Sequence, residues 1–211
     1  MSTIKTNQLA HTANGASIYT LPQTDGSAGQ VLKTDGSGNL SWTSLPSAGI
    51  TMADTWRLHT QYDIPTNSTT VLPTTNFERP DTSNDGFNQL GTGMSVDSSN
   101  HSAGLWTFPT TGFYLISYGG YGYNGDNDPY EVIVRMEFTE DGSSFGLQTR
   151  VYLSGERYNY NGGFGQMIVD VTDASTQKFR LRVYSAVSSS KLHGESSGNR
   201  NYLNFIRLGD T

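Results

Sequence analysis

Tyrosines gather beside amides, carboxylates and glycines between residues 118 and 160. A tyrosine ring offers stacking area at low entropic cost, while amide and carboxylate groups form hydrogen bonds with hydroxyl groups. This combination predicts a surface that binds a carbohydrate or another protein. The candidate residues are Tyr121, Tyr123, Asn124, Asp126, Asp128, Tyr158 and Tyr160. The alternative is that some of these rings pack inside the fold or between subunits, which we favour for Tyr118 because it continues the strand after Ile116.

Asn124, Asp126 and Asp128 stand at alternate positions, as in the opening of a calcium-binding loop. An EF-hand requires Gly at the sixth place and Glu at the twelfth. Those places hold Pro129 and Arg135, so the EF-hand is excluded. A calcium site of another kind remains open beside the alternative of a solvated acidic turn, and its weak candidate ligands are Asp126, Asp128 and Glu131. No other cofactor is predicted.

The sequence contains no motif of a zinc enzyme or of a serine hydrolase, because its histidines are isolated from other possible ligands. His11, His59, His101 and His193 have no partner at ligand spacing, and neither H-E-x-x-H nor G-x-S-x-G occurs. Residues 120–125 formally fit G-x-G-x-x-G, but a dinucleotide site needs a helix to begin there. An acidic turn and a strand follow instead, so we interpret these glycines as a loop at the rim of a sandwich. The sequence therefore predicts a protein that is not an enzyme.

Charge and composition argue against several classes of protein. The chain of 211 residues has 13 Lys and Arg against 19 Asp and Glu, giving a net charge of −6. Because the cations are spread thinly along the sequence, neither nucleic acid nor an anionic membrane surface is an expected partner. No stretch approaches about 18 apolar residues, so membrane insertion is not expected. Without cysteine, the chain cannot build a disulfide framework.

Residues 1–50 differ in character from the remainder and are predicted to form a separate arm. Asp-Gly turns recur ten residues apart, at residues 25–26 and 35–36, and the second suggests a short hairpin between Val31 and Trp42. The segment holds too little apolar surface for a core of its own. It is either a flexible leader or an attachment arm that becomes ordered against partners. The anchors proposed for attachment are Ile4, Leu9, Ile18, Tyr19 and Leu21.

From residue 51 to residue 211 the chain consists of short alternating segments separated by turns. Residues 130–138 place Val132, Val134, Met136 and Phe138 on one side, which predicts a half-buried antiparallel strand. Further strands are expected over residues 56–62, 69–72, 75–78, 104–108, 112–118, 147–153, 165–171, 178–186 and 202–208. No segment repeats with a helical period, so the fold class is all-β, an antiparallel sandwich.

The order of these segments resembles the jelly roll shared by C1q-like and tumour-necrosis-factor-like domains. The resemblance rests on residues 91–94, on the aromatic strands and proline turn of residues 105–116, and on the closing strand 202–208. Residues 169–171 and 178–183 are similar to that family's penultimate hairpin. The resemblance implies a jelly-roll head over residues 51–211 and a homotrimer.

Residues 19–22, 24–27 and 29–42 resemble a collar segment in tail fibres of cyanophages and other marine or freshwater bacteriophages. Residues 1–6 lack the apolar core of a signal peptide, and a virion protein made in the host cytoplasm needs none. The resemblance implies a short homotrimeric tail fibre whose arm docks on other virion proteins and whose head binds a host-surface glycan or protein. The alternative is a capsid head fibre or decoration protein. A polysaccharide-acting enzyme is disfavoured because no repeat coils occur.

Overall fold

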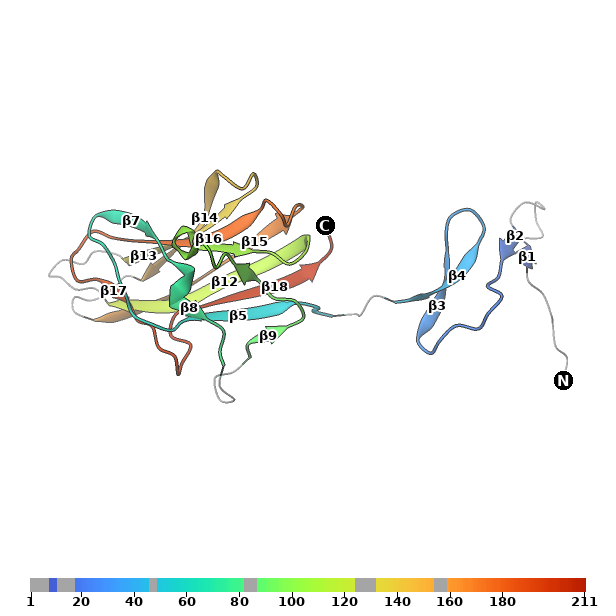
Figure 1. Ribbon diagram of the computed structural model, residues 1–211, viewed down its shortest axis with the longest axis horizontal. Coiled ribbons are helices and arrows are strands. Elements are labelled where there is room, and N and C mark those ends of the chain that lie inside the picture. The colour runs from blue at the N-terminus through green and yellow to red at the C-terminus, as the bar shows by residue number, and fades with distance from the viewer. Residues whose placement is uncertain (1–7, 11–17, 46–48, 82–86, 124–131, 154–158) are drawn as a thin grey trace. The chain divides into compact units, whose positions relative to one another are not determined.

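The structure is a computed structural model of residues 1–211, and it describes residues 8–10, 18–45, 49–81, 87–123, 132–153 and 159–211. The chain divides into two compact units, Met1–Gly49 and Ile50–Thr211, which we call the arm and the head (Figure 1). Among the described residues, no helix is long and apolar enough to span a bilayer.

The arm contains two antiparallel pairs of short strands. β1 (Gln8–Ala10) pairs with β2 (Ile18–Thr20), and β3 (Gln30–Thr34) pairs with β4 (Leu40–Ser44). The hairpin predicted between Val31 and Trp42 is thereby confirmed. At its turn, the Asp35 carboxylate accepts hydrogen bonds from the backbone N–H groups of Ser37 and Asn39, at 2.7 and 3.1 Å.

The head is a sandwich of two antiparallel sheets (Figure 1). The five-stranded sheet has the order β10 (Ser95–Val96), β11 (Leu105–Thr107), β16 (Lys178–Ser185), β13 (Val132–Thr139), β14 (Phe145–Leu153). The eight-stranded sheet has the order β6 (Tyr62–Asp63), β17 (Lys191–Leu192), β12 (Gly112–Tyr123), β18 (Tyr202–Gly209), β5 (Ala53–Leu58), β8 (Phe77–Glu78). In the same sheet, β15 (Tyr160–Val171) pairs with β12 and β9 (Gln89–Leu90) pairs with β5. Outside these sheet orders lie β7 (Ser68–Val71) and the 3₁₀ turns Thr74–Asn76 and His101–Ala103.

Aromatic side chains fill the space between the two sheets. Trp106 has no exposed surface and contacts four other rings, those of Trp56, Phe77, Phe179 and Phe205, with centroids 5.1 to 6.4 Å away. The alternation predicted for residues 132–138 is confirmed, because all four apolar side chains of that face are buried. Edge-to-face contacts between such rings stabilise a core beyond the burial of their area.

The segment Gly120–Tyr123 belongs to β12 and is not a loop, which corrects the sequence-based interpretation. β15 pairs with β12 along its full length, from Gly112↔Val171 to Tyr123↔Tyr160, so β15 also begins earlier than expected. Backbone pairing continues through the glycines of both strands, because a glycine lets the neighbouring chain approach closely. A Cβ atom on Gly120 would lie 2.1 Å from the side-chain oxygen of Asn201.

The similarity of residues 169–183 to a hairpin is also corrected. β15 pairs with β12 in one sheet, while β16 pairs with β11 and β13 in the other. The turn between them therefore crosses from one sheet to the other. Within it, Gln177 accepts hydrogen bonds from the backbone N–H groups of Thr172 and Asp173, at 2.8 and 2.9 Å.

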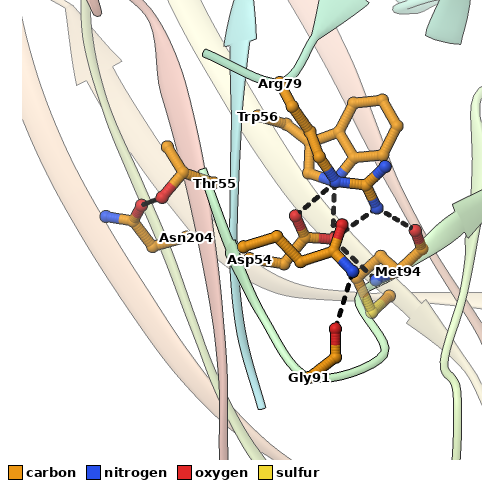
Figure 2. A network of polar contacts seen from close by, with 8 residues as sticks. Asp54, Thr55, Trp56, Arg79, Gly91, Met94 and Asn204 are labelled. Atoms are coloured by element: carbon orange, nitrogen blue, oxygen red, sulfur yellow. Dashed lines mark hydrogen bonds and ion pairs between the residues drawn. The ribbon is translucent and has the colours of Figure 1, made fainter. Parts of the chain in front are cut away.

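A buried carboxylate ties β5 to two segments that follow it (Figure 2). The Asp54 side chain, in a residue only 1% exposed, accepts two hydrogen bonds from the Arg79 guanidinium at 2.7 and 2.9 Å. It also accepts from the Trp56 indole N–H at 2.9 Å and from the Met94 backbone N–H at 2.6 Å. The guanidinium lies over the Trp56 ring, 4.3 Å from its centroid. The buried carboxylate is therefore fully paired, by a guanidinium whose side chain is 31% exposed and by two further donors.

Two surface turns are held by carboxylates with lowered pKa values. Backbone hydrogen bonds from Ser144 and Ser143 hold the pKa of Asp141 well below its ordinary value. The Ser175 hydroxyl and backbone N–H lower the pKa of Asp173 to about 2. Both carboxylates are more acidic in the folded chain than in the unfolded chain, so they stabilise the fold above about pH 4. That stabilisation is lost as the pH falls from about 4 towards 2 for Asp173, and at still lower pH for Asp141.

Replacing Ser175 by Ala is expected to lower Tm at pH 7 and to lower it progressively less as the pH falls. The substitution removes the hydroxyl donor that lowers the pKa of Asp173, and this donor matters only while the carboxylate is charged. Thermal unfolding at pH 7, 4 and 2 would measure the effect. Ser68→Ala, at an exposed position in β7, is the control and should show no pH-dependent difference. A Ser175→Ala difference that stays constant down to pH 2 would contradict the assignment.

Candidate functional site

Three of the sequence-predicted tyrosines meet at the far end of β12 in a group that we call the rim cluster. It consists of Tyr121, Tyr123, Tyr160 and His193. Tyr121 and Tyr123 share one face of β12 because side chains alternate along a strand. Tyr160 stands opposite Tyr123 in β15, and Gly162 stands opposite Tyr121, where the absence of a side chain leaves room for the rings.

The register of β17 brings His193 into the cluster. Lys191 pairs with Tyr123 and Leu192 with Gly122, so the next residue comes opposite Tyr121. The imidazole of His193 stacks on the Tyr121 ring, with an interplanar angle of 15° and centroids 5.7 Å apart. The Tyr160 ring stands at 79° to Tyr121 and at 86° to His193, so its edge meets both rings. The cluster therefore presents ring faces and ring edges in several orientations.

Charged and polar groups border the rings. Arg200 donates a hydrogen bond to the Tyr121 hydroxyl at 2.6 Å and also bonds the Glu195 carboxylate. These contacts lower the pKa of Glu195 and raise that of Arg200, in each case chiefly through the hydrogen bond between the two. The ammonium group of Lys191 lies 5.9 Å from the centroid of the Tyr123 ring.

Asn201 fixes the strand ends beneath the cluster. Its side-chain amide donates to the backbone oxygens of Tyr121 and His193, at 2.7 and 2.9 Å. Its side-chain oxygen accepts a hydrogen bond from the Tyr118 hydroxyl. Tyr118 is fully buried, as we predicted when favouring a packing role for it, and burial raises the pKa of its hydroxyl. Hydrogen bonds of Asn201 thus join the strand ends beneath the rim cluster.

The rim cluster lies at the end of the head opposite to the point where the chain enters it. Arg207 donates its backbone N–H to the Met52 oxygen and pairs with Tyr114, so residues 50–52 lie beside the start of β12. Tyr123 follows Tyr114 by nine residues in the same strand. At about 3.3 Å per residue, the two ends are separated by about 30 Å.

The structure does not describe the remaining candidate residues of the head. Asn124, Asp126, Asp128, Glu131 and Tyr158 lie outside the described residues, so both the calcium site and their part in a binding surface stay predictions. Among the described residues, no group of three or more acidic, histidine or cysteine side chains is placed to hold a metal ion.

The five proposed arm anchors are described to different extents. Leu9 in β1 pairs with Tyr19 in β2, and Ile18 begins that strand. Tyr19 is exposed and Leu21 is half-buried. Ile4 lies outside the described residues. A role in attachment stays a prediction for all of them.

Sequence reasoning missed the polar border of the rim cluster. His193, Glu195 and Arg200 follow β17 in the chain, and only the pairing of β17 with β12 brings them to the tyrosines. The sequence signal that could have indicated this border is the segment 191–200, in which Lys, His, Glu and Arg all occur. Aromatic faces with a guanidinium, an imidazole and a carboxylate at their edge can bind a ring-shaped polar ligand.

The outward side of the eight-stranded sheet carries, besides the rim cluster at one end, a second surface of apolar rows nearer the chain entry, which we call the sheet face. Leu115 lies between Ile168 of β15 and Ile206 of β18 in one cross-strand row. Phe164 lies opposite Gly119 in a second row. The side chains of Ile168 and Phe164 are 65% and 62% exposed. Large apolar side chains gathered in rows on an open sheet mark an interaction surface.

Comparison with known structures identifies the fold. The chain is similar to the Eiger TNF of S. frugiperda, with a TM-score of 0.51 and 13% identity over 75% of this chain and 93% of that one. It is similar to murine APRIL, with a TM-score of 0.50 and 11% identity over 74% of this chain and 98% of that one. A globular domain of zebrafish complement 1qA protein follows at a TM-score of 0.46 and 10% identity, over 77% of this chain and all of that one. No family profile and no curated protein matches the sequence. The predicted antiparallel jelly-roll sandwich is thus confirmed.

Proposed function

We propose that the protein is a non-enzymatic structural component of a bacteriophage virion, a short homotrimeric tail fibre. In this proposal the arm docks on other virion proteins and the head binds a glycan or protein on the host surface. The supporting observation is the rim cluster, which lies at the end of the head farthest from the entering chain. The resemblance of residues 19–42 to phage collar segments supports the virion location.

Self-association through the sheet face is part of this proposal. A single chain leaves Phe164 and Ile168 in contact with water, while a second and third copy would cover them. Burial of apolar area contributes roughly 25 cal/mol per Å², so covering these rows favours assembly. A closed ring of three heads would also place three rim clusters at one end. Binding a repeated surface glycan at several points raises the overall affinity without any new contact.

Replacing Tyr160 by Ala is expected to weaken binding to the host glycan about 30-fold, the loss typical of an aromatic residue that dominates an interface. The ring is 47% exposed and contacts three others of the cluster, so its removal takes away stacking surface without opening the core. Tyr160→Phe keeps the ring and should lose much less. The measurement is binding of the full-length protein to an array of bacterial surface polysaccharides.

Tyr19→Ala is the matched control, because it removes an exposed tyrosine from the arm and should leave array binding unchanged. Equal binding by Tyr160→Ala and the unmodified protein would contradict the assignment of the rim cluster. Immunogold labelling of purified virions tests the location separately. Label on the tail supports the tail fibre, while label on the capsid favours the head fibre or decoration protein.

A further inference from the structure

The outward side of the five-stranded sheet carries a row of three arginines. Arg182 in β16 pairs with Arg135 in β13, and Arg135 pairs with Arg150 in β14. Residues directly opposite one another in antiparallel strands project from the same face. Because neighbouring strands lie about 4.8 Å apart, the three side chains start within about 10 Å of one another. We call this surface the arginine row.

Like charges placed directly opposite each other destabilise a sheet, so the row needs a counter-charge. One carboxylate, that of Glu137, lies beside it, and it is occupied by Arg180 at 2.8 Å and by Arg182 at 3.7 Å. Within the described part of the chain, neither Arg135 nor Arg150 has an ion-pair partner. The Nε atoms of Arg135 and Arg182 are buried and without a hydrogen-bond partner there. Arg182 also donates to the Thr69 backbone oxygen at 2.8 Å. The unused capacity to bind anions therefore lies chiefly at the exposed Arg150 and the half-buried Arg135.

Tyrosines border the row on one side. Tyr184, Ile133 and Tyr152 form the next cross-strand row, and the Tyr152 side chain is 45% exposed. The Arg135 guanidinium lies 6.0 Å from the Tyr184 ring centroid. A guanidinium binds carboxylate or sulfate through two parallel hydrogen bonds, and a tyrosine ring stacks against a sugar ring.

We propose that the arginine row binds an acidic polysaccharide, with the carboxylate or sulfate groups at Arg135, Arg150 and Arg182. The row and the sheet face belong to different sheets and point away from each other, so assembly through the sheet face leaves the row open. Nucleic acid fits less well, because three arginines make too short a row to follow a phosphate backbone. The site does not depend on the rim cluster.

The test is retention of the full-length protein on immobilised heparin and polygalacturonate, with uncharged dextran as the reference. We expect retention on both acidic polymers at low salt and release as salt rises. Arg150→Gln, an exposed position, should weaken heparin binding several-fold, and Arg135→Gln/Arg150→Gln should weaken it at least 10-fold with a shallower salt dependence. Lys33→Gln removes one exposed positive charge from the arm and is the matched control.

Several outcomes would overturn the proposal. They are failure of the unmodified protein to bind either acidic polymer, an equal loss with Lys33→Gln, and tighter binding of oligothymidylate than of either polysaccharide. A structural role is distinguished by thermal unfolding, because removing a like charge should leave Tm unchanged or raised. A lowered Tm together with full heparin binding in Arg150→Gln would assign the arginine to packing instead. Tyr160→Ala should leave heparin retention intact.

Discussion

Substitution of Ile168 by Glu is expected to convert the assembled protein into monomers. The side chain is 65% exposed in the single chain and lies in the apolar row with Leu115 and Ile206. In the proposed trimer that row is covered by neighbouring copies, and each new carboxylate would lose its water without gaining a partner. An unpaired buried charge costs several kcal/mol, and a symmetric trimer would contain three of them.

Light scattering of the full-length protein measures this effect directly as a threefold fall in mass. Because Ile168 is exposed before assembly, the variant head should keep its fold, and unchanged far-ultraviolet circular dichroism would check this. Leu147→Glu introduces the same charge at an exposed position on the other sheet and should remain trimeric. Persistence of the trimer in Ile168→Glu would place the interface elsewhere, and a monomeric unmodified protein would refute the assembly.

The sequence predicts those elements of this fold whose signal is local. Alternation over residues 132–138 identifies β13 and its buried face, and the Asp-Gly turn at residue 35 identifies the hairpin of the arm. Both signals come from residues within one strand or one turn. The end of β12 was predicted wrongly because glycine is common in loops. Here it is required by the close approach of Asn201, whose position depends on the whole fold.

The binding surfaces were less predictable because they arise from register between distant strands. Arg135, Arg150 and Arg182 look dispersed along the sequence, and counting charges suggests no patch. The pairings of β13 with β14 and β16 place them side by side. His193 reaches Tyr121 in the same way, through two residue pairs between β17 and β12. Composition measures the amount of charge or aromatic surface, whereas sheet register determines where it gathers.

Replacing Asp54 by Ala is expected to lower the free energy of unfolding by about 2–5 kcal/mol, because two buried donors lose their acceptor at about 1–3 kcal/mol each. The Arg79 side chain is 31% exposed, so water can solvate its charge after the substitution. The Asp54 carboxylate satisfies the Trp56 indole, the Met94 backbone N–H and the Arg79 guanidinium (Figure 2). Without it, the indole and the Met94 N–H lose their acceptor, while the Arg79 guanidinium keeps only its bond to the Met94 backbone oxygen. Urea unfolding at a fixed protein concentration measures the loss, since assembly makes stability concentration-dependent. Asp63→Ala, at an exposed carboxylate, is the control and should cost well under 1 kcal/mol.

A double-mutant cycle with Arg79 separates the ion pair from the other contacts of the carboxylate. Arg79→Ala alone loses the pair with Asp54, the bond to the Met94 oxygen at 2.5 Å and the stacking on Trp56. Asp54→Ala/Arg79→Ala leaves no unpaired charge, so it should be less destabilised than the sum of the two single variants by about 1–3 kcal/mol. Additive losses would mean that the carboxylate acts mainly on the indole and the Met94 backbone. In that case the turn before β10, and not the ion pair, would be the structure that Asp54 maintains.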